Sequence, residues 1–223
     1  QNINRVQPLS LVSSLVQDIR SVGFQSLNFD LIYGLPGQTL KTIQETIHHV
    51  MELAPDLIAF YSYAHVPWVR PVQRTFKDSD LPPPETKLKL FEEAYHTLIT
   101  NGYRLIGMDH FATTEDELTK ALNQGTMHRN FMGYSTRGDA HQIGFGVSGI
   151  SYVNGNYFQN RKKIIEYENT VKQNHLATFR GVKLNRDDQI RRDLITYIMC
   201  TQKINFSDFS KKNNPAKIKA VNG

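Results

Sequence analysis

The first residue whose type and position could do chemistry is an aspartate near the end of a predicted strand. Asp30 lies in the run 27–33, and Gly-Leu-Pro-Gly follows at 34–37, a sequence typical of a turn that opens a helix. Because strand side chains alternate between two faces, Asp30 shares its face with Asn28 and Ile32. In a parallel barrel this end of a strand builds the binding site, so an inward carboxylate here can accept hydrogen bonds from a ligand. The alternative is a structural aspartate bonded to a neighbouring strand, and the sequence alone leaves both open.

Two other strand ends carry candidate site residues. The run 57–65 reads as a strand with Ile58, Phe60, Ser62 and Ala64 on one face, and a small residue such as Ala64 leaves room for a planar group or simply packs. The run 103–108 reads as a third strand that leads into Asp109 and His110. An imidazole beside a carboxylate can take part in acid-base chemistry, or hold an anion when protonated. A histidine bonded to a backbone carbonyl is the structural alternative.

A glycine-rich segment follows at 125–155. It carries seven glycines among polar and aromatic side chains, including His128, Arg129, Tyr134, Arg137, Asp139 and His141. Glycines let the backbone approach a ligand closely, so this segment is expected to contact one. Its Gly144–Gly149 spacing is wrong for a dinucleotide-binding fingerprint, and the sequence has neither a phosphate-binding P-loop nor a serine-hydrolase elbow.

The single cysteine limits the chemistry that this chain can supply. One thiol, Cys200, cannot form an internal disulfide framework or an all-cysteine metal or iron-sulfur site, so no metal site is predicted within the chain. Because Cys200 follows Ile195, Ile198 and Met199, we expect it to be a small buried apolar residue.

Composition indicates a globular protein without a membrane or nucleic-acid role. The 223 residues are 39% hydrophobic, enough for one large or two small domains, and no stretch is long and apolar enough to be a membrane span. The N-terminus lacks a signal-peptide pattern and cysteine is scarce, so a cytoplasmic location is expected. The net charge of +5 favours anionic partners, but basic residues interleaved with exposed aromatics, as nucleic-acid binding requires, are absent.

Alternating helix and strand patterns position these residues. Apolar spacing predicts a helix over 9–22 ended by Gly23, and a second from an N-cap at Thr39 to Pro55. Strand starts near 27 and 57 are one strand-helix-strand unit apart, which predicts a parallel pair. A third helix with Leu88, Phe91, Tyr95 and Leu98 on one face is expected further along. A capping box at 114–117 and a later helix beginning near Asn185 follow it.

Five segments of the sequence resemble oxygen-independent coproporphyrinogen III oxidase, a radical S-adenosylmethionine family of haem biosynthesis. They are residues 28–39, 63–67, 107–112, 128–134 and 186–193. The Leu-Ile-Tyr-Gly-Leu-Pro-Gly-Gln-Thr run is shared with haem chaperone-like relatives, whereas the segments 108–112 and 128–134 favour the oxidase. A non-catalytic haem- or porphyrin-binding relative and a non-catalytic interaction module are the alternatives.

The resemblance implies that a reduced [4Fe-4S] cluster splits S-adenosylmethionine, and that the radical oxidatively decarboxylates two propionates of coproporphyrinogen III to vinyl groups. It places S-adenosylmethionine contacts on Arg5, Asp30, Ala64 and Ile150. Coproporphyrinogen carries four carboxylates, so Arg129, Arg137 and a protonated His110 are the candidate substrate contacts.

The sequence departs from this family in one large respect, because the Cys-x-x-x-Cys-x-x-Cys cluster motif is not in it. We therefore expect a fragment that is inactive alone and whose partner is the missing N-terminal part of the same protein. The expected fold class is α/β: a partial parallel (β/α) barrel of the radical S-adenosylmethionine type, with its later strands in 1–160, and a truncated, mainly helical C-terminal region in 161–223. Missing strands would leave an exposed sheet edge and apolar surface.

Overall fold

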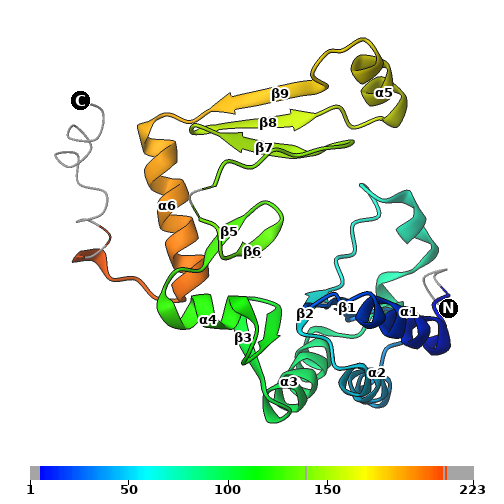
Figure 1. Ribbon diagram of the computed structural model, residues 1–223. Coiled ribbons are helices and arrows are strands. Elements are labelled where there is room, and N and C mark those ends of the chain that lie inside the picture. The colour runs from blue at the N-terminus through cyan, green and yellow to red at the C-terminus, as the bar shows by residue number, and fades with distance from the viewer. Residues whose placement is uncertain (1–5, 139, 208, 210–223) are drawn as a thin grey trace. The chain divides into compact units, whose positions relative to one another are not determined.

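The computed structural model describes residues 6–138, 140–207 and 209, which form two compact α/β units (Figure 1). The first comprises the described residues up to Lys120 and the second those from Ala121. In chain order the first contains α1 (Leu9–Ser21), β1 (Asn28–Tyr33), α2 (Leu40–Leu53), β2 (Leu57–Ser62), the 3-10 helices η1 (Pro71–Thr75) and η2 (Asp78–Asp80), α3 (Pro84–Thr100), β3 (Tyr103–Gly107) and β4 (His110–Thr113). After α4 (Glu117–Gln124), which crosses the division, follow β5 (His128–Asn130), β6 (Gly133–Ser135), β7 (Ile150–Val153), β8 (Asn156–Asn160), α5 (Ile164–Lys172), β9 (Thr178–Lys183) and α6 (Arg186–Thr201).

The sheet of the first unit is mixed, with the strand order β1-β2-β4-β3. β1 and β2 are parallel, as predicted, whereas β4 runs antiparallel to both β2 and β3. The prediction that Asp109 and His110 end a strand was wrong, because the chain turns back after Gly107 and His110 begins β4. Met108 makes that turn with a left-handed backbone (φ 49°). His110 therefore pairs with Ala59 of β2 in the middle of the sheet.

Two helices cover one face of this sheet. The apolar stripe of α2 packs beside α3 (Figure 1), and both bury the strand residues Ile58, Phe60 and Phe111. Fully burying side chains of this size stabilises the fold by roughly 1.5–3 kcal/mol each. The buried side chains of α3 are Leu90, Ala94 and Leu98, whereas Leu88 of the predicted face is 57% exposed.

Strand register decides which side chains face away from the helices. In the parallel pair Asp30 lies opposite Ala59, while Phe29 lies opposite Ile58 and faces the helices. The predicted shared face of Ile58 and Phe60 is confirmed, and it is the side buried under α2 and α3. β2 also ends at Ser62, before Ala64.

The turn after β1 depends on a glycine. Gly34 has φ +80°, and a Cβ there would lie 2.7 Å from Cε of Lys87, whose Nζ donates to the carbonyl oxygen of Tyr63 at 2.8 Å. Oε1 of Gln38 accepts from the Gly34 amide at 2.6 Å. The predicted cap at Thr39 is confirmed, because its side chain accepts from the amide of Thr42 in a capping box.

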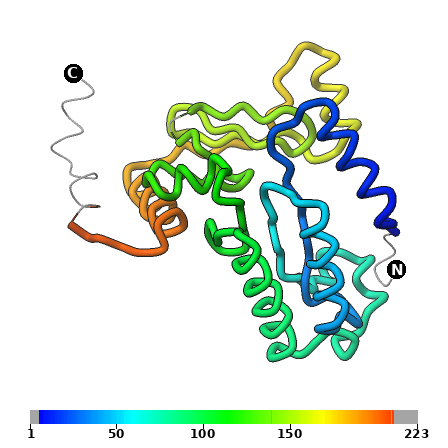
Figure 2. Tube along the Cα trace, turned by 60° about the horizontal axis from the view of Figure 1, so that its bottom comes forward, coloured from blue at the N-terminus to red at the C-terminus, as the bar shows by residue number. Residues whose placement is uncertain are grey.

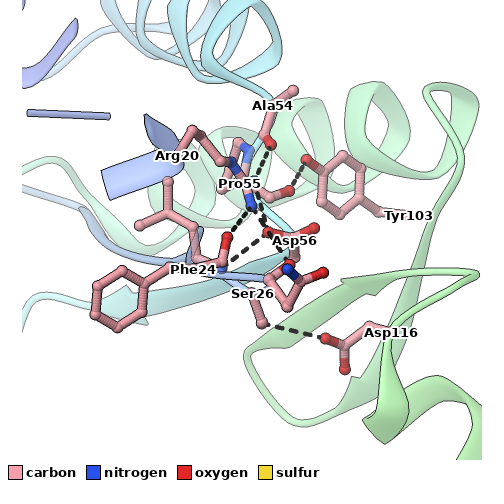
Figure 3. Close-up of polar contacts among 10 residues, drawn as sticks. Arg20, Phe24, Ser26, Ala54, Pro55, Asp56, Tyr103 and Asp116 are labelled. Carbon is pink, nitrogen blue, oxygen red and sulfur yellow. Dashed lines mark hydrogen bonds and ion pairs between the residues drawn. The ribbon is translucent and has the colours of Figure 1, made fainter. Parts of the chain in front are cut away.

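Polar contacts fasten the amino ends of the strands (Figure 3). Oδ2 of Asp56, just before β2, lies 2.6 Å from Nη2 of Arg20 on α1 and accepts from the Leu27 amide at 2.8 Å. Tyr103 at the start of β3 donates its hydroxyl hydrogen to the Pro55 carbonyl. These contacts link α1, β1, β2 and β3 at the amino ends of the strands. The carboxyl ends of the strands therefore remain free for a site.

The second unit is built on antiparallel strands. β5 and β6 form a hairpin, and β7, β8 and β9 lie side by side in one sheet (Figure 1, Figure 2). Because β8 ends at Asn160 and pairs with β9, the boundary expected at 160/161 falls inside this sheet. The predicted helix after Asn185 is confirmed as α6, which begins with an Asn185–Asp188 capping box.

Candidate carboxylate-binding site

The second unit holds a strongly basic cavity of about 300 Å³. We call it the arginine pocket and define it by its five basic lining residues, Arg129, Arg137, Arg192, His128 and His141. Asp and Glu are absent from its described lining residues. A cavity with this charge is suited to an anion, and planar guanidinium groups bind carboxylates with two parallel hydrogen bonds.

Arg129 reaches the pocket from the β5–β6 hairpin. Its register partner on β6 is Tyr134, and its guanidinium carbon lies 4.7 Å from the centroid of that ring. Nη1 of Arg129 is buried and has no hydrogen-bond partner among the described residues. Leaving a buried polar group unpaired costs about 1–3 kcal/mol or more, so this atom is suited to an acceptor from outside the chain.

Arg192 reaches the same pocket from α6, and two tyrosines of β7 and β8 hold its side chain in place. Its guanidinium carbon lies 4.3 Å from the Tyr152 ring centroid, and its Nε donates to the Tyr157 hydroxyl at 3.0 Å. Burial alone would lower its pKa, but the hydrogen bond to Tyr157 and the nearby tyrosines and Asp193 raise the pKa above its usual value. Arg192 is therefore a fixed positive charge.

Cys200 lies on the face of α6 that carries Arg192, and it is close enough to Arg129 to feel the charge of that arginine. The predicted burial of the cysteine is confirmed, since it is 5% exposed. Burial raises the pKa of its thiol, and the charge of Arg129 opposes that rise. The neutral thiol is thus favoured, which suits a packing residue rather than a nucleophile.

The exposed face of the first unit's sheet carries the predicted aspartate. Asp30 is exposed, and its Oδ1 accepts from Nδ2 of Asn28 at 2.9 Å. The remaining lone pairs of this carboxylate point to no protein donor in the contacts described. A ligand amino or hydroxyl group can therefore bind there.

The predicted histidine-carboxylate pair is in contact. Nδ1 of His110 lies 2.7 Å from Oδ1 of Asp109, and its half-buried ring stands edge-on to Tyr61 with centroids 5.8 Å apart. The carboxylate contact orients the imidazole ring.

The other predicted contacts are placed by their own surroundings in the chain. Ala64 follows β2, and its carbonyl accepts from Nε2 of Gln73 at 3.1 Å. Ile150 begins β7, where a Cβ on Gly144 would lie 2.6 Å from its amide nitrogen, so the glycine permits this close packing. Arg5 lies outside the described residues.

The structure thus brings Arg129 and Arg137 into one cavity, as their shared proposed role requires, while Asp30, Ala64 and His110 belong to the first unit. Sequence reasoning did not single out Arg192. Its signal was available, because an arginine eight residues before the buried Cys200 falls on the apolar stripe of the helix.

The chain does not fit an iron-sulfur cluster by itself. It has one cysteine, which is buried, and no group of three or more His, Cys, Asp or Glu residues in its described part could hold a metal ion. None of the helices in the described ranges combines the length and hydrophobicity needed to cross a membrane.

Comparison with known proteins gives consistent matches. The chain is 42% identical over 210 residues to the oxygen-independent coproporphyrinogen III oxidase of Escherichia coli K12, covering 94% of this chain and 46% of that protein. The corresponding Synechocystis protein is 41% identical over 214 residues, which cover 96% of this chain and 46% of that protein. No protein-family model matches the chain.

A solved structure agrees with these relatives. It is the coproporphyrinogen III oxidase of Escherichia coli, described as a radical S-adenosylmethionine enzyme, and it matches with a TM-score of 0.89 at 42% identity over 95% of this chain and 49% of that one. The chain is therefore related, over about half of their length, to the oxygen-independent coproporphyrinogen III oxidases.

Proposed function

We propose that this chain is the later part of a radical S-adenosylmethionine coproporphyrinogen dehydrogenase and that its arginine pocket binds propionate carboxylates of coproporphyrinogen III. The pocket is the observation that carries the proposal, because three arginines and two histidines around about 300 Å³ match an anionic substrate. The complete protein would convert two propionates to vinyl groups and give protoporphyrinogen IX. Each conversion removes one hydrogen atom, one electron and carbon dioxide.

The chain's own residues would bind and orient in this reaction. Arg129 and Arg137 would hold carboxylates, and a protonated His110 would add a further cation where the complete barrel brings it to the substrate. Arg5, Asp30, Ala64 and Ile150 are the proposed S-adenosylmethionine contacts. Among them the exposed carboxylate of Asp30 suits ribose or amino groups. When bound in the complete protein, the [4Fe-4S] cluster supplies the electron that cleaves S-adenosylmethionine.

The cysteine-bearing N-terminal part of the same protein is the proposed partner. In the described sheet β1 is an edge strand, and its unpaired side offers backbone groups to a further strand. A groove of about 610 Å³ runs beside it between α1, β1 and α2. On α1, Leu11 and Leu15 are 61% and 54% exposed. A preceding strand and helix of a (β/α) barrel would cover this edge and groove.

A fusion tests the proposal. The part of the Escherichia coli relative that precedes its matched region is joined to this chain, and the fusion is assayed without oxygen for deoxyadenosine and for vinyl product. We expect both from the cluster-loaded fusion and neither from this chain alone. A fusion that folds and holds its cluster but forms neither product contradicts the oxidase proposal.

One observation favours a second candidate, a non-catalytic porphyrin-binding protein. The arginine pocket is formed entirely within the second unit and needs no cluster to bind a carboxylate. If the fusion forms no product while this chain still binds coproporphyrin III, the binding role is the correct one.

A further inference from the structure

The arginine pocket adjoins a second cavity of about 410 Å³, which we call the apolar cavity. The two have a common wall of five lining residues, Arg129, Asn130, Phe131, Tyr157 and Arg192. The apolar cavity is also lined by Leu184 and by Ile195, Thr196 and Met199 of α6. Each cavity is near the lower end of the roughly 300–1,000 Å³ range of small-molecule pockets.

The charged residues at the rim of the apolar cavity already have partners. Oδ2 of Asp188 accepts from the Asn185 amide at 3.0 Å in the cap of α6. Nε of Arg191 lies 2.6 Å from Oδ2 of Asp187. The positive charge on the common wall comes from Arg129 and Arg192, and Nη1 of Arg192 also lies 3.3 Å from Oδ1 of Asp193.

The common wall also presents an aromatic surface. Phe131, at the tip of the β5–β6 hairpin, is 63% exposed and stands edge-on to Tyr157 with ring centroids 5.2 Å apart. Ile195 across the cavity is 61% exposed. A flat apolar ligand that covers exposed apolar groups beside a cavity removes their surface from water, which favours binding.

We propose that the two cavities form one site for an amphiphilic acid, in which Arg129 and Arg192 bind a carboxylate and the apolar cavity holds the planar apolar group that carries it. The buried Nη1 of Arg129 supplies an unpaired donor for that carboxylate. Tyr152 and Tyr157 hold Arg192 in place before the ligand arrives, which lowers the ordering cost of binding.

The natural ligand rests on the proposed function, and it is a propionate-bearing pyrrole ring of the substrate. This assigns Arg192 as a carboxylate contact in addition to Arg129 and Arg137. The acid specificity of the paired cavities can be measured with a probe that is not a tetrapyrrole, so the site and the proposed function are tested separately.

The experiment titrates the complete 223-residue chain with pyrenebutyrate and with pyrenebutanol, its uncharged analogue, and follows pyrene fluorescence. We expect the acid to bind about tenfold or more tightly than the alcohol, because each charge-assisted hydrogen bond adds that order of affinity. Arg192→Gln and Arg129→Gln should each reduce acid binding about tenfold and leave alcohol binding unchanged. Arg192→Lys should recover part of the loss.

Two further variants separate the site from folding effects. Ile195→Ala should weaken both probes, since it removes apolar contact only. The matched control is Arg180→Gln. In the parent chain Nε of Arg180, on β9, donates to Oε1 of Gln159 at 2.9 Å on an exposed surface. The Arg180→Gln variant should bind both probes as the parent chain does. Equal affinity for acid and alcohol, no binding of either, or an Arg192→Gln chain that behaves like Arg180→Gln would overturn the proposed site.

The outcomes for site and function stay distinct. A fusion without product leaves the acid preference for pyrenebutyrate as it is, so only the oxidase proposal falls. Loss of that preference with normal vinyl product means that the enzyme binds its carboxylates elsewhere.

Discussion

The carboxylate of Asp56 lies 2.6 Å from the guanidinium of Arg20 and also accepts from the Leu27 amide at 2.8 Å (Figure 3). One side chain thereby joins the end of α1, the start of β1 and the start of β2. The ion pair is part-exposed, so solvent screens the charge, and the bond to the Leu27 amide makes the larger contribution.

Asp56→Ala should lower the free energy of unfolding by about 2 kcal/mol, because it removes both bonds and leaves a half-buried amide unpaired. Urea unfolding followed by circular dichroism measures the change. Glu45→Ala is the control, since Glu45 forms an exposed pair with Lys41 at 4.0 Å and should cost less than about 0.5 kcal/mol. Similar losses in the two variants would contradict the role given to Asp56.

Tyr103 should make stability fall at alkaline pH. Burial, together with the nearby charge of Asp56, raises the pKa of Tyr103 from 10.0 to about 12. The folded state keeps a proton that the unfolded chain loses near pH 10, so the stabilisation is complete below pH 10 and is lost as the pH rises through about 12.

Tyr103→Phe is the comparison for this pH effect. It removes the hydroxyl bond to the Pro55 carbonyl and should cost about 1 kcal/mol at neutral pH. The difference in unfolding free energy between the parent chain and this variant should shrink between pH 10 and pH 12. A constant difference across that range would contradict the assignment.

Gly34→Ala should destabilise the first unit for two reasons, its φ of +80° and a Cβ 2.7 Å from Cε of Lys87. We expect a loss of about 2 kcal/mol in urea unfolding. Gly102→Ala isolates the backbone cost, since Gly102 has φ +88° with nothing within 4 Å of a Cβ. If the two variants lose the same stability, the contact with Lys87 has no effect.

Cys200 should report on the stability of the second unit. Burial both raises its pKa and blocks access, so its reaction with a thiol reagent in the native chain should be slower than in the urea-unfolded chain by on the order of 100-fold. Asp56→Ala acts in the first unit and should leave the native rate unchanged. Rapid labelling of the native chain would show that α6 does not protect the thiol.

Local signals in the sequence were enough to predict α1, α2 and the parallel β1–β2 pair. Thr39 has a side chain that caps a helix, Gly23 permits the left-handed residue after α1, and the spacing of apolar residues located α1, α2 and the parallel β1–β2 pair. Each of these features depends on residues close together in the chain.

The hairpin between β3 and β4 could not be predicted in the same way. Met108 adopts a left-handed backbone without being glycine or asparagine, so the turn has no clear mark in the sequence. The sequence also did not tell which face of β2 the helices cover, because an apolar strand can be buried from either side until its register with β1 is known.

The basic residues of the site could be proposed from the sequence, but not their assembly. Arg129 and Arg137 were proposed as carboxylate contacts from their type, and the structure places Arg129 on β5 and Arg137 just after β6, both lining one cavity. Arg192 joins them from α6, more than fifty residues away in the chain, by a tertiary contact that no local pattern encodes.

The most direct test of the central claim is a titration of this chain with coproporphyrin III, the stable oxidised form of the proposed substrate, followed by its absorption spectrum. Saturable binding is expected, with affinity about tenfold or more lower in the double variant Arg129→Gln/Arg137→Gln and unchanged in Arg180→Gln. No spectral change in the parent chain, or equal affinity in the double variant and the control, would contradict the claim that the arginine pocket binds the propionates.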